Sequence, residues 1–198
     1  MEYDFLKNVV FFRHGETEWN AKKMIQGWLD SPLTERGIQE TKNAIPALAQ
    51  YDFKKIISSP AGRTFQTAKI IAETLGIANI EINDNFAERG FGKMEGMTKE
   101  QAIAGFPELW DEKNRFSQER ETPSGETIEQ IYKRILLAVE YLAKEARSEK
   151  VLVTTHDTFL KFFASYITKT SIRETKNKDF PHCEPIIFDE KFDLYDCL

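Results

Sequence analysis

Three side chains that carry or can take up positive charge stand just beyond apolar runs of the kind that form buried strands. Arg13 comes directly after residues 7–12, Arg63 follows a run that ends near Ser58, and His156 follows a third run. Because the carboxyl ends of parallel strands meet at one edge of a sheet, these three groups are predicted to share one rim. Guanidinium and imidazolium donors gathered there could surround a phosphoryl group and stabilise its charge without a metal ion.

The residues around His14 indicate an anion site at the end of the first of these runs. His14 stands between Arg13 and Gly15, and the following residues, Glu16 and Thr17, can begin a helix. Glycine allows the backbone to approach a ligand closely, and the N-terminus of a helix favours an anion. We therefore expect a phosphate or a similar anion to bind beside His14.

The elements that must position these side chains alternate between strand and helix along the chain. Short apolar runs rich in β-branched and aromatic residues predict strands, and apolar residues at helical spacing predict amphipathic helices. The predicted strands lie at residues 7–12, 53–58, 80–82 and 151–155, and the predicted helices at 34–50, 61–75 and 127–146. This order predicts an α/β fold of three layers, in which helices cover both faces of a mostly parallel central sheet.

Several boundaries of these elements follow from individual residues. Thr34 is the predicted cap of the first helix, and Gly76 is predicted to end the second. Pro46 is expected to kink or divide the helix that contains it. Asp157 is expected to start a further helix, and the tail from Pro185 is predicted to add a final strand.

Length and composition favour a single domain. The chain has 198 residues, of which 41% are hydrophobic and 30% are charged, as in ordinary globular proteins. Residues 1–198 are thus predicted to form one domain without linkers or repeats. The net charge of −5 disfavours nucleic acids and anionic membranes as partners, because these select basic surfaces. A few converging arginines can nevertheless bind a small anionic substrate.

Targeting and metal-binding signals are not evident in the sequence. The N-terminus lacks the basic start and long apolar run of a secretory signal, and no stretch approaches membrane-spanning length, so a cytoplasmic protein is expected. The two cysteines, Cys183 and Cys197, suggest no disulfide framework. Three histidines without short ligand spacing predict no metal site. No cofactor is predicted, and the sequence pattern indicates no particular oligomeric state.

Five segments, taken in order, resemble the motifs of the histidine phosphatase superfamily, in particular its phosphoglycerate-mutase-like branch. They are RHGETEWN at 13–20, QGW at 26–28 with PLTERG at 32–37, SSPAGRTFQTA at 58–68, ERGFGKMEG at 88–96 and PSGET at 123–127. The resemblance covers the chain from Val9 to His156, whereas the remainder carries little recognisable signal. It implies transfer of a phosphoryl group through a histidine.

The resemblance also implies roles for individual residues. His14 would accept the phosphoryl group, and Glu88 would donate a proton to the leaving oxygen. Arg13, Arg63 and His156 would hold the phosphoryl oxygens. The chemistry agrees, because a nucleophilic imidazole must be neutral and an ordinary histidine pKa of about 6.5 leaves it mostly so at neutral pH. The expected substrate-binding residues are Asn20, Gln26, Gly27 and Asp157.

Departures from the family pattern leave alternatives open. Asp157 stands where glycine commonly follows the second histidine, so it is expected either to cap a helix or, as in the acid-phosphatase branch, to donate the proton assigned to Glu88. Glu16 and Glu95 also compete for the acid role. His182 replaces an asparagine often found late in the chain, and it is either a surface residue or part of the pocket.

The sequence therefore predicts a metal-independent phosphomonoester hydrolase that acts through phosphohistidine on a small phosphorylated metabolite. The first alternative is a cofactor-dependent phosphoglycerate mutase, whose relatives usually carry a longer segment after the acidic loop than residues 96–123 provide here. The second alternative is a catalytically silent phosphate-binding or regulatory protein. The complete set of expected catalytic residues disfavours this last interpretation.

Overall fold

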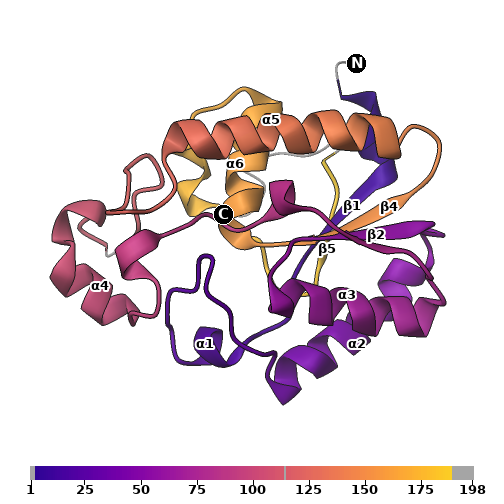
Figure 1. Cartoon of the computed structure of the whole chain (residues 1–198), viewed down its shortest axis with the longest axis horizontal. Coiled ribbons are helices and arrows are strands. Elements are labelled where there is room, and N and C mark those ends of the chain that lie inside the picture. The colour runs from indigo at the N-terminus through magenta and orange to yellow at the C-terminus, as the bar shows by residue number, and fades with distance from the viewer. Residues whose placement is uncertain (1–2, 114, 189–198) are drawn as a thin grey trace.

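The centre of the structure, a computed structural model that describes residues 3–113 and 115–188, is a five-stranded sheet (Figure 1). Its strands are β1 (Val9–Arg13), β2 (Lys55–Ser58), β3 (Ile80–Ile82), β4 (Val151–Thr155) and β5 (Pro185–Ile186). They lie in the order β3-β2-β4-β1-β5. The first four are parallel, and β5 pairs with β1 in the antiparallel direction. The predicted mostly parallel sheet and the predicted final strand from Pro185 are confirmed.

Helices cover both faces of this sheet, as predicted. The α-helices are α1 (Glu18–Ala21), α2 (Glu35–Ala49), α3 (Gly62–Leu75), α4 (Lys99–Gly105), α5 (Ile128–Glu145) and α6 (Asp157–Thr168). Short 3-10 helices occur at Asp4–Asn8, Asp84–Phe86, Gly92–Met94, Pro107–Leu109 and Glu174–Asn177. In Figure 1, α2 and α3 lie below the sheet and α5 and α6 lie above it.

Strand β1 shows why the sheet is buried on both sides. Val9 and Phe11 belong to the apolar core that includes residues of α5 and α6, whereas Val10 and Phe12 belong to the core on the α2 and α3 side. All four side chains are at most 2% exposed. Burial of each stabilises the fold by about 2 kcal/mol, so this strand anchors both helical layers.

The helix boundaries test the local signals in the sequence. Thr34 and Thr127 cap α2 and α5 by accepting backbone hydrogen bonds, and Gly76 ends α3 in the left-handed conformation with a φ of 70°. Pro46 was predicted to kink or divide its helix, and the division is wrong, because α2 runs through Pro46 without a break. Proline removes one helical hydrogen bond there, and packing of the buried side chain of Leu48 offsets that loss.

The candidate catalytic residues stand where three strands end together. Arg13 at the end of β1 pairs with Thr155 of β4, and Ser58 at the end of β2 pairs with Thr154. Helix α4 and its flanking segments lie to one side of these ends (Figure 1) and have a small apolar core of their own. In the described part of the chain, no helix has both the length and the apolar character needed to cross a membrane.

The loop that follows β1 is fixed by backbone contact with the first turn of α2. A Cβ atom on Gly37 would lie 2.1 Å from the backbone oxygen of Glu16. A Cβ atom on Gly15 would lie 2.5 Å from the backbone oxygen of Gly37. These glycines let the chain around His14 approach the helix more closely than any side chain permits.

We predict that Gly37→Ala destabilises the protein because neither backbone segment can yield cheaply. The free energy of unfolding should fall by about 1–3 kcal/mol, as for overpacked sites generally. The matched control is Gly105→Ala, since a Cβ atom on Gly105 would meet nothing within 4 Å. Denaturant unfolding of the two variants measures the difference, and equal stabilities would contradict the close contact.

Candidate active site

His14 is a buried histidine with one ring nitrogen committed to the backbone. Its Nδ1 lies 2.8 Å from the backbone oxygen of Gly15, and the residue is 4% exposed. Because a carbonyl oxygen only accepts, Nδ1 must carry the proton, and Nε2 then keeps its lone pair. Burial lowers the pKa of His14 well below its ordinary value, and the neighbouring charges of Arg63 and Arg13 lower it further. The ring is thus held in the neutral, nucleophilic form.

Arg63 connects three parts of the site through a buried guanidinium. Its Nη1 donates to the backbone oxygen of Leu29 at 2.8 Å and to the carboxylate of Asp30 at 2.9 Å. Its Nη2 donates to the backbone oxygen of Gly27 at 2.9 Å and to Nδ1 of His156 at 3.2 Å. The side chain is 1% exposed. The arginine therefore ties the loop at residues 27–30 to the end of β4.

His156 has partners at both ring nitrogens. Since Arg63 can only donate, Nδ1 of His156 accepts, and Nε2 carries the proton that it donates to the hydroxyl of Ser59 at 2.7 Å. Burial lowers the pKa of His156 well below its ordinary value, helped by Arg63 and His14. The rings of His14 and His156 are 5.3 Å apart between centroids.

Arg13 is held from the C-terminal part of the chain. Its Nη1 donates to the backbone oxygen of Phe180 at 2.6 Å and lies 3.8 Å from the carboxylate of Asp157. Nδ1 of His182 donates to the backbone oxygen of His14 at 2.6 Å. His182 is thus a neighbour of the nucleophile rather than a free surface residue, and burial lowers its pKa.

Glu88 caps a helix, and its carboxyl group has a shifted pKa. Its carboxylate accepts hydrogen bonds from the backbone N–H groups of Thr158 and Phe159, at 3.3 and 3.0 Å, and so caps the N-terminus of α6. Burial raises the pKa of Glu88, although the hydrogen bond from its neighbour Arg89 works in the opposite direction. The nearby charge of Asp157 raises this pKa further.

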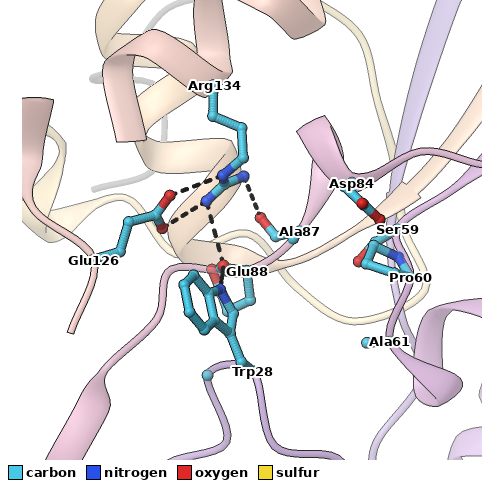
Figure 2. A pocket seen from close by; sticks show the side chains of 10 residues that line it. Trp28, Ser59, Pro60, Ala61, Asp84, Ala87, Glu88, Glu126 and Arg134 are labelled. Atoms are coloured by element: carbon cyan, nitrogen blue, oxygen red, sulfur yellow. Dashed lines mark hydrogen bonds and ion pairs between the residues drawn. The ribbon is translucent and has the colours of Figure 1, made fainter. Parts of the chain in front are cut away.

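The backbone at Glu88 is held from two sides (Figure 2). Arg134 pairs with Glu126 at 2.8 Å and donates to the backbone oxygens of Ala87 and Glu88. The indole Nε1 of Trp28 donates to the same oxygen of Glu88 at 2.9 Å. These residues line a second cavity of about 370 Å³, and Gly27 and Glu88 line both this cavity and the one that contains His14.

Asp157 does not cap its helix, so that alternative from the sequence is wrong. The N-cap residue is His156, and the capping acceptor is Glu88. The carboxylate of Asp157 instead accepts from the ammonium of Lys161 at 2.7 Å and from the backbone N–H of Phe180 at 3.1 Å. Burial alone would raise the pKa of Asp157, but these partners and Arg13 outweigh burial and lower it.

The expected substrate-binding residues differ in how many of their polar groups already form hydrogen bonds within the protein. Asn20 spends its amide oxygen on Thr17 in a capping box, while Gln26 donates to Thr17 and accepts from Ser31. Gly27 has a φ of 56°. Asn20, Gln26, Gly27 and Asp157 all line the His14 cavity, which measures about 500 Å³. Of the two amides, that of Gln26 is therefore the more fully committed within the protein.

The two other acids proposed from the sequence, Glu16 and Glu95, are not among the residues that line the His14 cavity. Glu16 accepts from the hydroxyl of Thr34 and lies 3.6 Å from Arg36. Glu95 accepts from the backbone N–H groups of Trp28 and Phe91, at 3.1 and 2.8 Å. Glu95 therefore joins the two loops that flank the cavity, a role that sequence reasoning missed.

Other supporting residues also escaped prediction. Asp30 and Ser59 orient the arginine and the second histidine, and Lys161 is a buried lysine that pairs with Asp157. The hydrophobic positions around Lys161 in α6 were the available signal for its burial. Across residues 3–113 and 115–188, no cluster of three or more histidine, cysteine or acidic side chains is arranged to hold a metal ion. Cys183 is free and buried, and Cys197 lies outside the described residues.

The chain belongs to the histidine phosphatase superfamily (branch 1), whose family model matches residues 9–191. Among individual relatives, a 2,3-bisphosphoglycerate-dependent phosphoglycerate mutase of Parvibaculum lavamentivorans is 30% identical over 191 residues, which cover 91% of this chain and 89% of that protein.

Solved structures show the same fold. YhfR of Bacillus stearothermophilus superposes with a TM-score of 0.77 at 28% identity, covering 88% of this chain and 85% of that one. A mycobacterial glucosyl-3-phosphoglycerate phosphatase gives a TM-score of 0.76 at 22% identity, covering 89% of this chain and 88% of that one, and this likeness concerns the fold alone. The proteins that this chain resembles thus include one named as a mutase, similar in sequence, and one named as a phosphatase, similar in fold.

The low pKa values of His14 and His156 predict how stability depends on pH. The unfolded chain binds protons at these histidines as the pH falls through 6.5, whereas the folded protein does not, so the free energy of unfolding should fall below that pH. Each histidine contributes up to about 1.4 kcal/mol per pH unit. The raised pKa of Glu88 contributes with the opposite sign, since its proton stabilises the fold as the pH falls towards 4.5.

The measurement compares the free energy of unfolding of wild type and of His14→Gln as a function of pH. Glu88 contributes to both proteins, so its effect cancels in the difference. Wild type should lose more stability than the variant between pH 7 and pH 5, by roughly 1–2 kcal/mol. Parallel pH curves for the two proteins would mean that His14 titrates in the fold as it does in the unfolded chain.

Proposed function

We propose that this protein is a metal-independent phosphomonoester hydrolase that transfers a phosphoryl group from a small phosphorylated metabolite to His14 and then to water. The observation that supports it most is the state of His14, a buried neutral imidazole whose Nδ1–H is bound to a carbonyl oxygen. Two guanidinium groups and two carboxyl groups line the same cavity. This combination suits attack on phosphorus by Nε2.

In the first half of the proposed reaction, Nε2 of His14 forms a bond to phosphorus while the ester P–O bond breaks. Glu88 gives its proton to the departing oxygen, which its raised pKa favours. In the second half, the Glu88 carboxylate takes a proton from water, the water oxygen bonds to phosphorus, and the P–N bond breaks. Inorganic phosphate and neutral His14 are restored together.

Arg13, Arg63 and His156 are the proposed holders of the phosphoryl oxygens. Nε of Arg13 and of Arg63 is buried without an acceptor among the described residues, and an anion would supply acceptors in their vicinity. The four guanidinium Nη hydrogen bonds of Arg63 already have protein acceptors, and the contact with His156 is the longest, at 3.2 Å. We infer that a phosphoryl oxygen accepts from Nη2 of Arg63 in place of Nδ1 of His156. His156 then holds a phosphoryl oxygen as the imidazolium, with a proton taken up at Nδ1 that the negative charge of the phosphate favours.

Asn20 and Gly27 complete the proposed phosphate site. The amide nitrogen of Asn20 and the backbone N–H of Gly27 have no hydrogen-bond acceptor among the contacts of the described residues that line the cavity. Gln26 shapes the cavity through Thr17 and Ser31. A cytoplasmic location, and independence from nucleic acids and membranes, remain predictions of the sequence.

A phosphohistidine intermediate is the direct test of this function. Brief reaction of wild type with an activated aryl phosphate, followed by an alkaline quench and mass spectrometry of peptides, should find acid-labile phosphate on His14. His14→Ala should lose turnover by at least about 10³-fold while melting as a folded protein. An acid-resistant phosphopeptide, or full activity in His14→Ala, would contradict the mechanism, as would activity that depends on added zinc or magnesium.

A phosphoglycerate mutase is the second candidate, because curated relatives such as the Parvibaculum protein carry that name. A mutase keeps the phosphoryl group in the site and returns it to the substrate. Incubation of 3-phosphoglycerate with 2,3-bisphosphoglycerate separates the two functions. Release of free phosphate supports the hydrolase, whereas rapid exchange of the 2- and 3-isomers without phosphate release would establish the mutase.

Glu88→Gln and Asp157→Asn distinguish the two acids proposed from the sequence. Asp157 has a lowered pKa and is paired with Lys161, so it is a poor proton donor. Glu88→Gln should therefore lower kcat/KM, which reports the formation of phosphohistidine, by about 10²–10⁴-fold for an alkyl phosphate and much less for an activated aryl phosphate, since that leaving group needs little protonation.

Asp157→Asn should instead affect both substrates to a similar extent, because Asp157 acts on the position of Arg13 through Phe180. Selective loss of alkyl phosphate hydrolysis in Asp157→Asn, together with normal rates in Glu88→Gln, would transfer the acid role to Asp157. The kcat/KM values of the four combinations of variant and substrate decide the assignment.

A further inference from the structure

The cavity that contains His14 has a second group of lining residues, which come from outside the sheet. Phe91 follows the Glu88 loop, Trp110 and Phe116 come from the segment after α4, and Met24 and Met94 complete an apolar surface. With a volume of about 500 Å³, the cavity is of the size that binds whole small molecules. Its lining therefore also contacts the part of a substrate that leaves.

We propose that the substrate of this site carries an apolar, ring-sized leaving group that binds against Phe91, Trp110 and Phe116. This inference rests on the proposed hydrolase function and names its substrate class. A polyhydroxylated leaving group would lose hydration against these side chains, which could offer it one hydrogen bond in return, from the indole Nε1 of Trp110. A flat apolar group instead gains from burial and from contact with aromatic rings.

The aromatic wall is a built feature of the fold. The rings of Phe91 and Phe116 meet edge to face with centroids 5.5 Å apart, and Trp110 and Phe116 do the same at 5.5 Å. Behind them, the fully buried guanidinium of Arg89 lies 5.7 Å from the Phe91 ring and 5.4 Å from the Phe116 ring. Arg89 also donates to the backbone oxygen of Gln118 at 2.9 Å. The wall is thus held in place before a ligand arrives.

The polar groups near this wall favour a small acidic leaving group less strongly than the aromatic rings favour an apolar one. The ammonium of Lys99 lies over the Trp110 ring at 5.8 Å, and Lys23 also lines the cavity, but both side chains are exposed and water screens their charges. Gln118 is buried and directs its amide oxygen towards Arg89 at 3.4 Å. Selection by the half-buried aromatic surface should therefore exceed selection by the lysines.

The test compares phosphate esters whose leaving alkoxides have similar basicity, so that chemistry does not mask binding. We expect kcat/KM for benzyl phosphate and 2-phenylethyl phosphate to exceed that for ethyl phosphate, glycerol 1-phosphate and 3-phosphoglycerate by at least about tenfold. Phe116→Ala should lower the value for benzyl phosphate by about tenfold or more and change that for ethyl phosphate by less than about threefold.

A second variant guards against a general loss of structure, since Phe116 also packs against Arg89. Met24→Gln keeps the length of the side chain and makes its tip polar, and it should reduce the preference for benzyl over ethyl phosphate in the same direction. Leu136→Ala removes an exposed leucine on α5, away from the cavity, and should leave every rate unchanged. Thermal melting confirms that each variant is folded.

The outcomes separate this inference from the function on which it rests. Equal kcat/KM values for benzyl and ethyl phosphate, a preference for 3-phosphoglycerate, or equal losses on all esters in Met24→Gln would overturn the apolar leaving group and leave the hydrolase intact. Absence of both turnover and phosphohistidine with every ester would overturn the hydrolase and this inference together.

Discussion

The buried guanidinium of Arg63 is the constraint on which the site depends. A cation removed from water must be given acceptors, because an unpaired buried charge costs several kcal/mol, on the order of 3–5. Here the acceptors are the backbone oxygens of Gly27 and Leu29, the carboxylate of Asp30 and Nδ1 of His156. Satisfying one charge therefore fixes the loop beside the cavity and the orientation of the second histidine.

The same charge controls the protonation of its neighbours. Burial disfavours the imidazolium form of His14 and His156, and the positive charge of Arg63 adds to this effect at both rings. A site that gathers cations for a phosphate thus also keeps its nucleophile neutral. Asp157, which is paired with the buried Lys161, accepts from the backbone N–H of Phe180, and the oxygen of Phe180 holds Arg13. The C-terminal part of the chain supports the nucleophile in this way, although it carries little sequence signal.

Local signals in the sequence predicted most of the fold, and long-range contacts account for what they missed. Thr34 and Gly76 mark helix ends through interactions within a few residues, so both could be read from the sequence. The acceptor that caps α6 comes from Glu88, about seventy residues earlier in the chain, so Asp157 was assigned a capping role that it does not have. The break expected at Pro46 does not occur, because the local cost of a proline in a helix does not include the packing that stabilises α2.

The candidate site shows the same division. The residues that follow the strands lie together as expected, because the carboxyl ends of parallel strands meet at one edge of the sheet. Glu95 and Lys161 were missed, since a glutamate in a glycine-rich loop and a lysine in a helix resemble solvated residues until their partners are known. Their importance lies in contacts with Trp28 and Asp157, which no local pattern contains.

Glu88 illustrates how a structural contact can serve chemistry. The N–H groups of Thr158 and Phe159 at the start of α6 favour its carboxylate, whereas burial favours its protonated form. A residue that must first give up a proton and later take one from water works best when neither form is strongly preferred. The helix terminus opposes the effect of burial on Glu88, so the contact that anchors α6 also limits how far burial raises the pKa of this carboxyl group.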